Sequence, residues 1–292
     1  MSDSYLIVPL ELEVLNLPAA QSVISEMADF SRLPWSDGKA DYNTATPYLG
    51  EAVTAPPFQN QNLNLSSGLH LHWLLPKALR TSQNKQGKVA FPAAPDRWLV
   101  SRTVANSTIQ WVIESDYMSE KCSTYNMDAI TVPVLRENVN SATTQPYMYL
   151  GRQLPLAEWI AEKNCTKNKY WKDVQGGADF TAMGYGEVSF STFYPNCRSV
   201  FGLFDHEAPP NASYEVLGWY SCDEDDILNG KTNDDIESQL KWHIANGGTP
   251  TRSLYYGIVD TSDLKASTPP ELSQIAVGNS GTEALSAYLA NV

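Results

Sequence analysis

Two histidines, His70 and His72, stand two residues apart in the stretch GLHLHWLLPKAL, which covers residues 68–79. Side chains along a strand repeat their direction every second residue, so both imidazole rings are expected on one face of a strand. Neutral imidazoles placed in this way can bind the same metal ion. The pair is therefore the first candidate for a metal site.

A metal site needs further ligands, and the sequence places none beside the pair. The residues that follow include Lys77 and Arg80, whose positive charges oppose the binding of a cation. Only His206, or Asp205 next to it, could complete a ligand set by folding of the chain. We therefore predict no metal and no cofactor. We interpret the two histidines as structural, with the neighbouring leucines facing the core and the imidazole rings on a half-exposed face.

Three other motifs invite a chemical interpretation and lack the residues that it requires. The acidic run CDEDDILNG at 222–230 lacks the alternating ligands of an EF-hand, and we interpret it as a solvated turn. The stretch GNSGTE at 278–283 is a short turn without a nucleophile elbow, and the glycines of 176–188 do not form a phosphate-binding fingerprint. Paired carboxylates for glycoside chemistry stay open, because their separation depends on the tertiary structure. The sequence does not identify catalytic residues, which are unknown.

The composition restricts the partners. The chain has 33 acidic and 20 basic residues, a net charge of -13, so nucleic acid and anionic membranes are unfavourable partners. The N-terminus has no basic region followed by a continuous apolar run, and no stretch approaches the roughly 18 apolar residues of a spanning helix. We expect a chain that is cytoplasmic as synthesised and does not insert into a membrane. Any export would use a dedicated machine and no signal peptide.

Period-two patterns dominate and predict about nine strands. The stretches are YLIVPLELEVL, LHLHWLL, RWLVSRTV, TIQWVIES, YMYLG, EVSFSTFY, RSVFGLFD, YEVLGWYS and SLYYGIVD. Four short helices are expected at Gln21–Phe30, after Pro155, after a cap at Asp234 or Asp235, and from Thr282. The predicted fold class is α+β and rich in β, with mainly antiparallel sheets in a sandwich or barrel-like arrangement.

The domain organisation is predicted as a single β-rich module over residues 1–292. A polar run at 136–146 is the place where a seam between two domains would fall. The four cysteines are widely separated and contain no Cys-x-x-Cys pair, which favours free thiols over a disulfide framework. The chain ends inside a predicted amphipathic helix, and we expect it to be the N-terminal part of a longer protein.

Several stretches together resemble a family: GLHLHWLLPKAL, FPAAPDRWLVSR, STFYPNCRSVFGLFD, SYEVLGWYS and IAVGNSGTEALSA. They are similar to the N-terminal region of large uncharacterised bacterial proteins associated with phage-tail-like contractile injection systems. The resemblance covers about residues 5–290. It implies a cargo or accessory protein that associates with components of such a particle, and it implies no catalytic residues.

The leading hypothesis for function is a non-enzymatic docking or packing module of a larger protein, with a protein assembly as its partner. The first alternative is a hydrolase or metal-dependent toxin enzyme that uses His70, His72 and His206. The second alternative is a carbohydrate-binding module, for which the 8 Trp and 15 Tyr residues would provide stacking surfaces. The sequence predicts no particular oligomeric state.

Overall fold

The computed structural model describes residues 4–25, 35–36, 39–40, 61–85, 87–121, 130–133, 147–162, 169–182, 199–244, 248–262 and 275–277.

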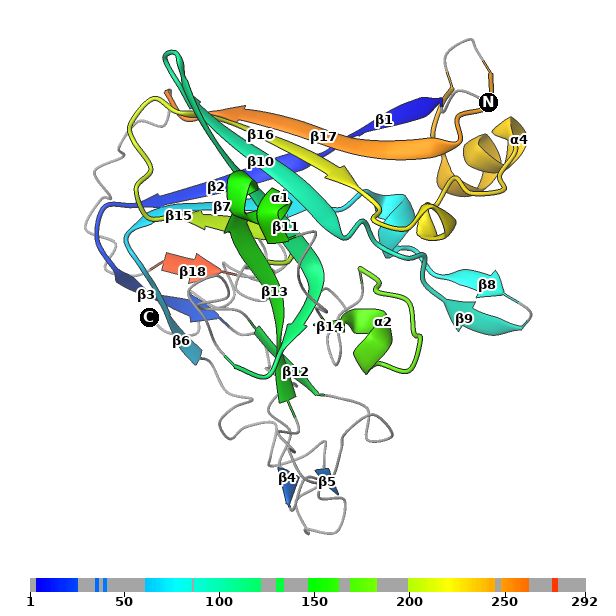
Figure 1. Ribbon diagram of the computed structural model, residues 1–292, viewed down its shortest axis with the longest axis horizontal. Helices are drawn as coiled ribbons and strands as arrows, with labels where there is room; N and C mark the ends of the chain where they lie inside the picture. The colour runs from blue at the N-terminus through cyan, green and yellow to red at the C-terminus, as the bar shows by residue number, and fades with distance from the viewer. Residues whose placement is uncertain are drawn as a thin grey trace.

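An eight-stranded sheet runs across the molecule in the order β1-β17-β16-β10-β11-β13-β12, with β14 beside β11 (Figure 1). Its neighbouring strands are antiparallel except for β1 and β17, which are parallel. The sheet is open along the described chain, because β1 and β12 form its two ends. Its strands are β1 (Tyr5–Pro9), β10 (Arg97–Val104), β11 (Ser107–Ser119), β12 (Ile130–Pro133), β13 (Tyr147–Pro155), β14 (Lys169–Tyr170), β16 (Ser213–Trp219) and β17 (Arg252–Asp260).

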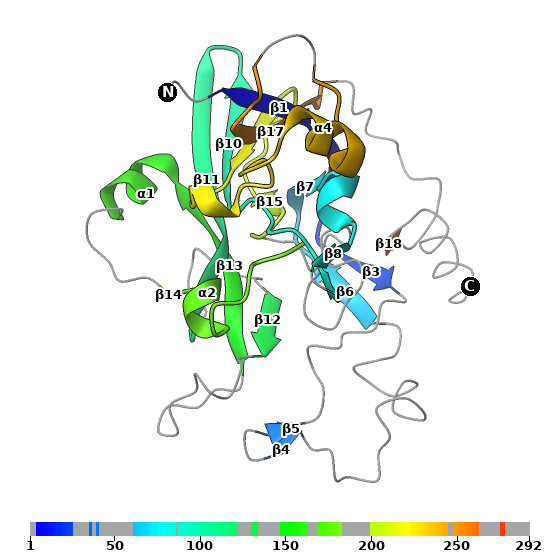
Figure 2. The same cartoon turned by 90° about the vertical axis from the view of Figure 1, so that its right-hand side faces the viewer.

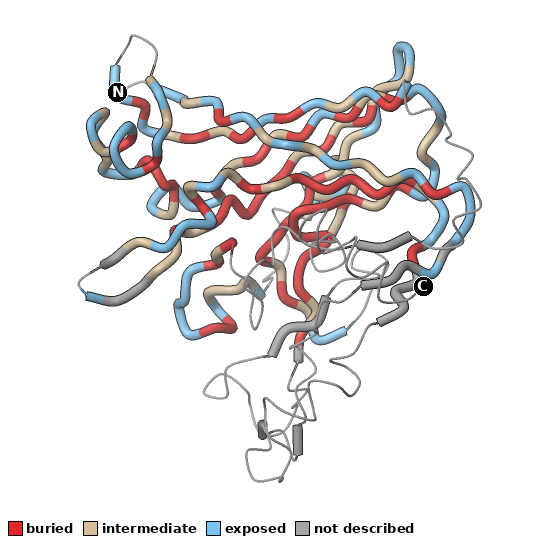
Figure 3. Tube along the Cα trace, turned by 180° about the vertical axis from the view of Figure 1, so that it is seen from behind, coloured by how far each residue is buried: buried red, intermediate tan, exposed pale blue. Residues whose placement is uncertain are grey.

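A second antiparallel sheet, in the order β15-β7-β2, packs against one face of the first. The rings of Trp73 on β7 and Trp98 on β10 are 5.3 Å apart at the centre of the core between the sheets. Seen from behind, the strands of both sheets are buried where they face each other (Figure 3). We call the face of the large sheet that points away from this core the outer face. The strands of the second sheet are β2 (Glu11–Leu17), β7 (Gly68–Leu74) and β15 (Gly202–Asp205).

Smaller elements surround the two sheets (Figure 2). The remaining strands are β3 (Gln21–Ser25), β4 (Trp35–Ser36), β5 (Lys39–Ala40), β6 (Gln61–Leu65), β8 (Gln83–Lys85), β9 (Lys88–Ala90) and β18 (Ile275–Val277). The helices are η3 (Lys77–Arg80), α1 (Leu156–Glu162), α2 (Trp171–Val174), η6 (Asp223–Asp225), α4 (Asn233–Asp235) and the π-helical η7 (Ile236–Leu240). No helix of this described set is long and apolar enough to cross a membrane.

The predicted fold class is confirmed: the protein is β-rich, mainly antiparallel, and has few short helices. One expected strand divides, because the chain leaves the large sheet at Leu10, between β1 and β2, and continues in the second sheet. The helix predicted at Gln21–Phe30 is wrong for its described part, which forms strand β3 between β6 and β18. The β-branched Val23 and Ile24 suit a strand, and pairing on both sides outweighs a weak helical periodicity.

The other helix predictions have mixed outcomes. Helix α1 follows Pro155 as expected. The helix expected after Asp234 or Asp235 is capped instead by Thr232, whose hydroxyl accepts from the Asp235 amide while the Asp235 carboxylate accepts from the Thr232 amide. This reciprocal capping box satisfies two amides that the first helical turn leaves open. The seam at 136–146 and the helix from Thr282 lie outside the described residues.

Trp98 fixes how closely β16 approaches the core. A Cβ on Gly218 would lie 2.1 Å from the Trp98 ring, so only glycine fits opposite this indole. The Trp98 Nε1–H donates to the Ser115 hydroxyl at 2.9 Å, and that hydroxyl donates to the Val200 carbonyl at 2.5 Å. A buried indole N–H needs such a partner, so the position of Trp98 is determined by both packing and hydrogen bonding.

Candidate functional site

The two histidines of the predicted strand do share one face of β7, but they are not half-exposed. His70 and His72 are each 2% exposed. The Nε2 of His70 donates to the Ser66 carbonyl at 2.9 Å, and its ring stacks on Phe204 with centroids 4.7 Å apart. These contacts bury and orient the ring.

His72 pairs with an acidic residue of the neighbouring strand. Its Nδ1 lies 3.4 Å from the Glu13 carboxylate, and this hydrogen bond lowers the pKa of Glu13. His206, the third candidate ligand, is 73% exposed in the turn after β15, with Nε2 3.5 Å from Glu207 Oε1. Within the described ranges, no three His, Cys, Asp or Glu side chains are grouped so that they could hold a metal ion. The three histidines thus have different partners.

Asp205, the alternative third ligand, accepts hydrogen bonds from three other residues. Its Oδ2 accepts from Arg102 Nη1 at 2.6 Å and from the Tyr214 hydroxyl at 2.8 Å. The Glu207 amide donates to the other carboxylate oxygen at 3.1 Å. Asp205 lies on the second sheet while Arg102 and Tyr214 lie on the large one. This buried ion pair therefore links the two sheets.

A row of large polar side chains crosses four strands of the outer face, and no sequence motif indicated it. Trp219 is opposite Arg97, Arg97 is opposite Glu114, and Glu114 is opposite Arg152. We call these four residues the charged row. Arg97 Nε lies 3.5 Å from Glu114 Oε1, and Arg152 Nε donates to Glu114 Oε2. Opposite charges in register across strands stabilise the pairing.

A bulge interrupts the pairing of β11 and β13 directly after Glu114. Between the pairs Glu114–Arg152 and Met118–Leu150, β11 contributes residues 115–117 and β13 contributes only Gly151. Gly151 has a φ of +81°, and a Cβ there would lie 2.2 Å from the Ser199 carbonyl oxygen. Three residues of β11 therefore lie opposite one residue of β13, and such an unequal pairing is a bulge that disrupts the alternation of β11.

Asp116, inside this bulge, binds the same guanidinium as Glu114. Its Oδ1 accepts from Arg97 Nη1 at 2.5 Å. Asp96 Oδ2 lies 3.6 Å from the same nitrogen and accepts from the Ser221 hydroxyl, while Asp96 Oδ1 accepts from the Ser221 amide. Burial raises the pKa of Asp116 to about 7 in spite of the neighbouring guanidinium. Three carboxylates thus surround one arginine.

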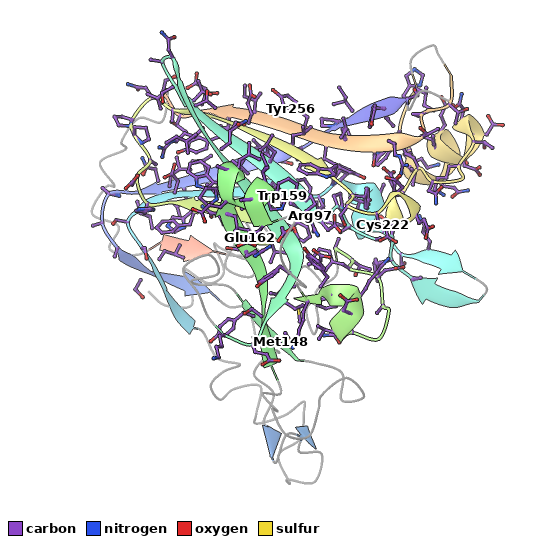
Figure 4. All side chains as sticks on the ribbon, in the orientation of Figure 1. Arg97, Met148, Trp159, Glu162, Cys222 and Tyr256 are labelled. Atoms are coloured by element: carbon purple, nitrogen blue, oxygen red, sulfur yellow. The ribbon has the colours of Figure 1, made fainter. Side chains whose placement is uncertain are left out.

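Helix α1 covers this part of the outer face (Figure 4). The Trp159 Nε1–H donates to Glu114 Oε1 at 3.0 Å, and Trp159 packs edge-on against Trp219 with centroids 6.5 Å apart. Glu162, at the end of α1, accepts from Arg152 Nη1 at 2.9 Å. The polar groups of the charged row therefore bind one another and hold α1 on the sheet. This arrangement is a structural network that joins the sheet to α1.

The other end of the outer face exposes apolar side chains. Tyr5 and Ile7 on β1 are 55% and 66% exposed, and Tyr256 and Ile258 on β17 are 37% and 56% exposed. These four residues, which we call the apolar strip, alternate along their strands with residues that are buried in the core. They share the outer face because β1 and β17 pair in register, with Pro9 opposite Tyr256, and directly paired residues lie on the same face of a sheet. Figure 4 shows Tyr256 on β17, away from Trp159 on α1.

Acidic residues border the apolar strip. Glu215 is exposed on β16 directly opposite Ile258, and Asp260 is exposed at the end of β17. An apolar surface edged by charges of one sign is typical of a surface that binds a partner of the opposite sign.

The acidic run of 222–230 is only partly the solvated turn that we expected. Asp226 is buried and accepts from the Ser253 amide at 2.8 Å and the Leu228 amide at 2.9 Å. Burial raises the pKa of Asp226. Asp225 instead pairs with Lys172 at 2.6 Å. Cys222, at the start of the run, is an exposed free thiol.

The apolar strip could not be located from the sequence. The stretch SLYYGIVD is apolar at both alternating sets of positions, so the pattern shows a strand without showing which face is covered. Comparison with protein families, with curated proteins and with solved structures finds no match for this chain.

Proposed function

We propose that this protein is a non-enzymatic docking module that binds a basic surface of another protein through the apolar strip. The observation that carries the proposal is the exposure of four large apolar side chains on one face of β1 and β17, near exposed acidic residues. We further propose, from the family resemblance, that the module belongs to a larger bacterial cargo or accessory protein of a contractile injection system.

The energetics favour association through this surface. Burying a large apolar side chain contributes about 1.5–3 kcal/mol, so covering even part of the apolar strip would support a specific complex. The net charge of -13 would mainly raise the rate at which a basic partner is encountered. Apolar contact would thus supply affinity, and the acidic border would supply selectivity for a basic partner.

The metal-enzyme alternative gains no support from the described residues. Two of its three histidines are buried and bonded to Ser66 and Glu13, and the third is exposed beside Glu207. The carbohydrate alternative loses Trp73 and Trp98, which are fully buried, although Tyr5 and Tyr256 of the apolar strip stay exposed.

A matched pair of substitutions tests the proposal. Ile258→Asp places a charge in the apolar strip, whereas Ile109→Asp places the same charge on an isoleucine that is 43% exposed on β11 opposite Arg102, away from the strip. Tagged wild-type protein and both variants are incubated with purified phage-tail-like particles, and co-sedimentation is measured at low and high salt. We expect binding by wild type and by Ile109→Asp, weaker binding at high salt, and about tenfold or greater weakening by Ile258→Asp.

Two results would contradict the proposal. Equal loss of binding in both variants would mean that the strip has no special role. Catalytic turnover of an esterase, glycosidase, peptidase or nuclease substrate that one substitution abolishes, together with no co-sedimentation, would favour an enzyme.

A further inference from the structure

Strand β1 lies at the edge of the large sheet. One side of its backbone pairs with β17, and the other side points away from the sheet. Among the described strands it pairs with β17 alone. The Ser4 carbonyl accepts from the Arg252 amide at 3.2 Å, and the Leu10 amide donates to the Tyr256 carbonyl at 2.8 Å. Backbone groups of a strand alternate between its two edges, so the even-numbered residues of β1 bond to β17.

The odd-numbered residues of β1 therefore present their backbone groups at the outer edge. Tyr5 and Ile7 each offer an N–H and a carbonyl there, while Pro9 offers only a carbonyl because proline has no N–H. The same two residues carry the most exposed side chains of the apolar strip. An open edge with exposed apolar side chains is a template for one more strand.

We propose that the partner of this module contributes an extended segment that pairs with β1 as an additional strand. The inference rests on the proposed docking function and specifies how it operates. The segment would be apolar at alternate positions, to continue the apolar strip, and would carry lysine or arginine at its ends. Main-chain hydrogen bonds would provide affinity, and the alternate side chains would provide specificity, as in other cases of strand addition.

The negative charge of this chain favours a basic segment over a second copy of the chain as the partner. The whole chain carries a net charge of -13. Two copies of a chain with this net charge would repel each other, which disfavours a second copy as the added strand. A basic segment would instead be attracted by the acidic chain.

The first experiment measures backbone pairing directly. The probe is a synthetic peptide of alternating valine and threonine with two lysines at each end, added to the intact chain. Amide hydrogen exchange is followed by NMR. In the free protein the Leu6 and Val8 amides should be protected by β17, whereas the Tyr5 and Ile7 amides should exchange rapidly. The peptide should slow the exchange of Tyr5 and Ile7 by about tenfold or more.

Two variants of one residue separate the backbone from the side chain. Ile7→Ala removes the apolar side chain and keeps the outward N–H, while Ile7→Pro also removes that N–H, which β17 does not use. We expect Ile7→Pro to bind the peptide about tenfold more weakly than Ile7→Ala. If Ile7→Pro does not fold, the exchange experiment on the wild type still decides.

Each other outcome overturns the strand-addition proposal in a recognisable way. Peptide binding without slower exchange at Tyr5 and Ile7 would mean docking through side chains only and would leave the proposed function intact. No peptide binding would exclude a basic extended segment, and the Ile258→Asp comparison with particles would still test docking. Slow exchange at Tyr5 and Ile7 without peptide, increasing with protein concentration, would identify a second copy as the occupant.

Discussion

Arg97 and Asp116 form a buried ion pair on neighbouring strands, with Nη1 and Oδ1 2.5 Å apart, although regular pairing places Arg97 opposite Glu114. Asp116 follows Glu114 by two residues on β11, and side chains at this spacing point to the same face of a strand. One guanidinium therefore lies between two carboxylates of the same strand. The Tyr170 ring lies 5.0 Å from the Arg97 guanidinium carbon, which adds a favourable cation–π contact.

Asp116 should make stability depend on pH. Burial raises the pKa of its carboxyl group from 3.8 to about 7, against the attraction of Arg97, and Asp96 and Glu114 add to the rise. Between these values the folded protein keeps a proton that the unfolded chain releases. The contribution of Asp116 to the free energy of unfolding therefore falls as the pH rises from 3.8 to about 7. Asp116→Asn should remove this decline, as measured by urea unfolding across that range.

Asp260→Asn provides a contrasting variant. The Ser262 amide donates to Asp260 at 2.8 Å and lowers its pKa. Its stabilising effect is present above the ordinary pKa of 3.8 and is lost only as the pH falls further. Asp260→Asn should therefore keep the wild-type decline at mildly acidic pH. The same decline in Asp116→Asn would show that another group causes it.

Gly218→Ala should destabilise the protein by about 1–3 kcal/mol, because the added methyl group collides with the Trp98 ring. Gly248→Ala is the control, since a Cβ there would meet nothing within 4 Å and should change stability by less than about 0.5 kcal/mol. The free energy of unfolding is measured by urea titration. A smaller side chain at position 98 should partly rescue Gly218→Ala, and equal effects of the two glycine substitutions would refute the packing argument.

Asp205→Ala should destabilise the protein by about 3–5 kcal/mol, because it leaves the buried Arg102 guanidinium without its carboxylate. Adding Arg102→Met to this variant should recover part of the loss, since no buried charge is then unpaired. Glu120→Ala breaks the exposed pair with Lys169 and should cost less than about 1 kcal/mol. Additive effects of Asp205→Ala and Arg102→Met would argue against a direct link between the sheets.

His70 and His72 should not confer stoichiometric metal binding. Each ring already has a partner, the Ser66 carbonyl for His70 and the Glu13 carboxylate for His72. Protein purified without added metal is analysed for zinc, iron and manganese before and after replacing both histidines with alanine. We expect no stoichiometric metal in either sample. A metal that is present in the wild type and lost from the variant would restore the metal-enzyme hypothesis.

The sequence by itself determined the strand content, because alternation of apolar and polar residues follows directly from the geometry of an extended chain. The stretch RWLVSRTV became β10 over the predicted residues, and both histidines lie on one face of one strand as their spacing requires. The helix expected at Gln21 failed where its periodicity was weak and pairing with β6 was available. Composition also gave the acidic character that the docking proposal uses.

Only the tertiary structure decided which groups meet and which faces stay open. Glu114 and Arg152 are 38 residues apart in the chain, and their contact depends on a strand register that no local pattern specifies. Tyr255 and Tyr256 are neighbours of the same residue type, yet one is fully buried and the other is 37% exposed. Adjacent side chains of a strand point to opposite faces, and the burial of each depends on which distant part of the chain packs there.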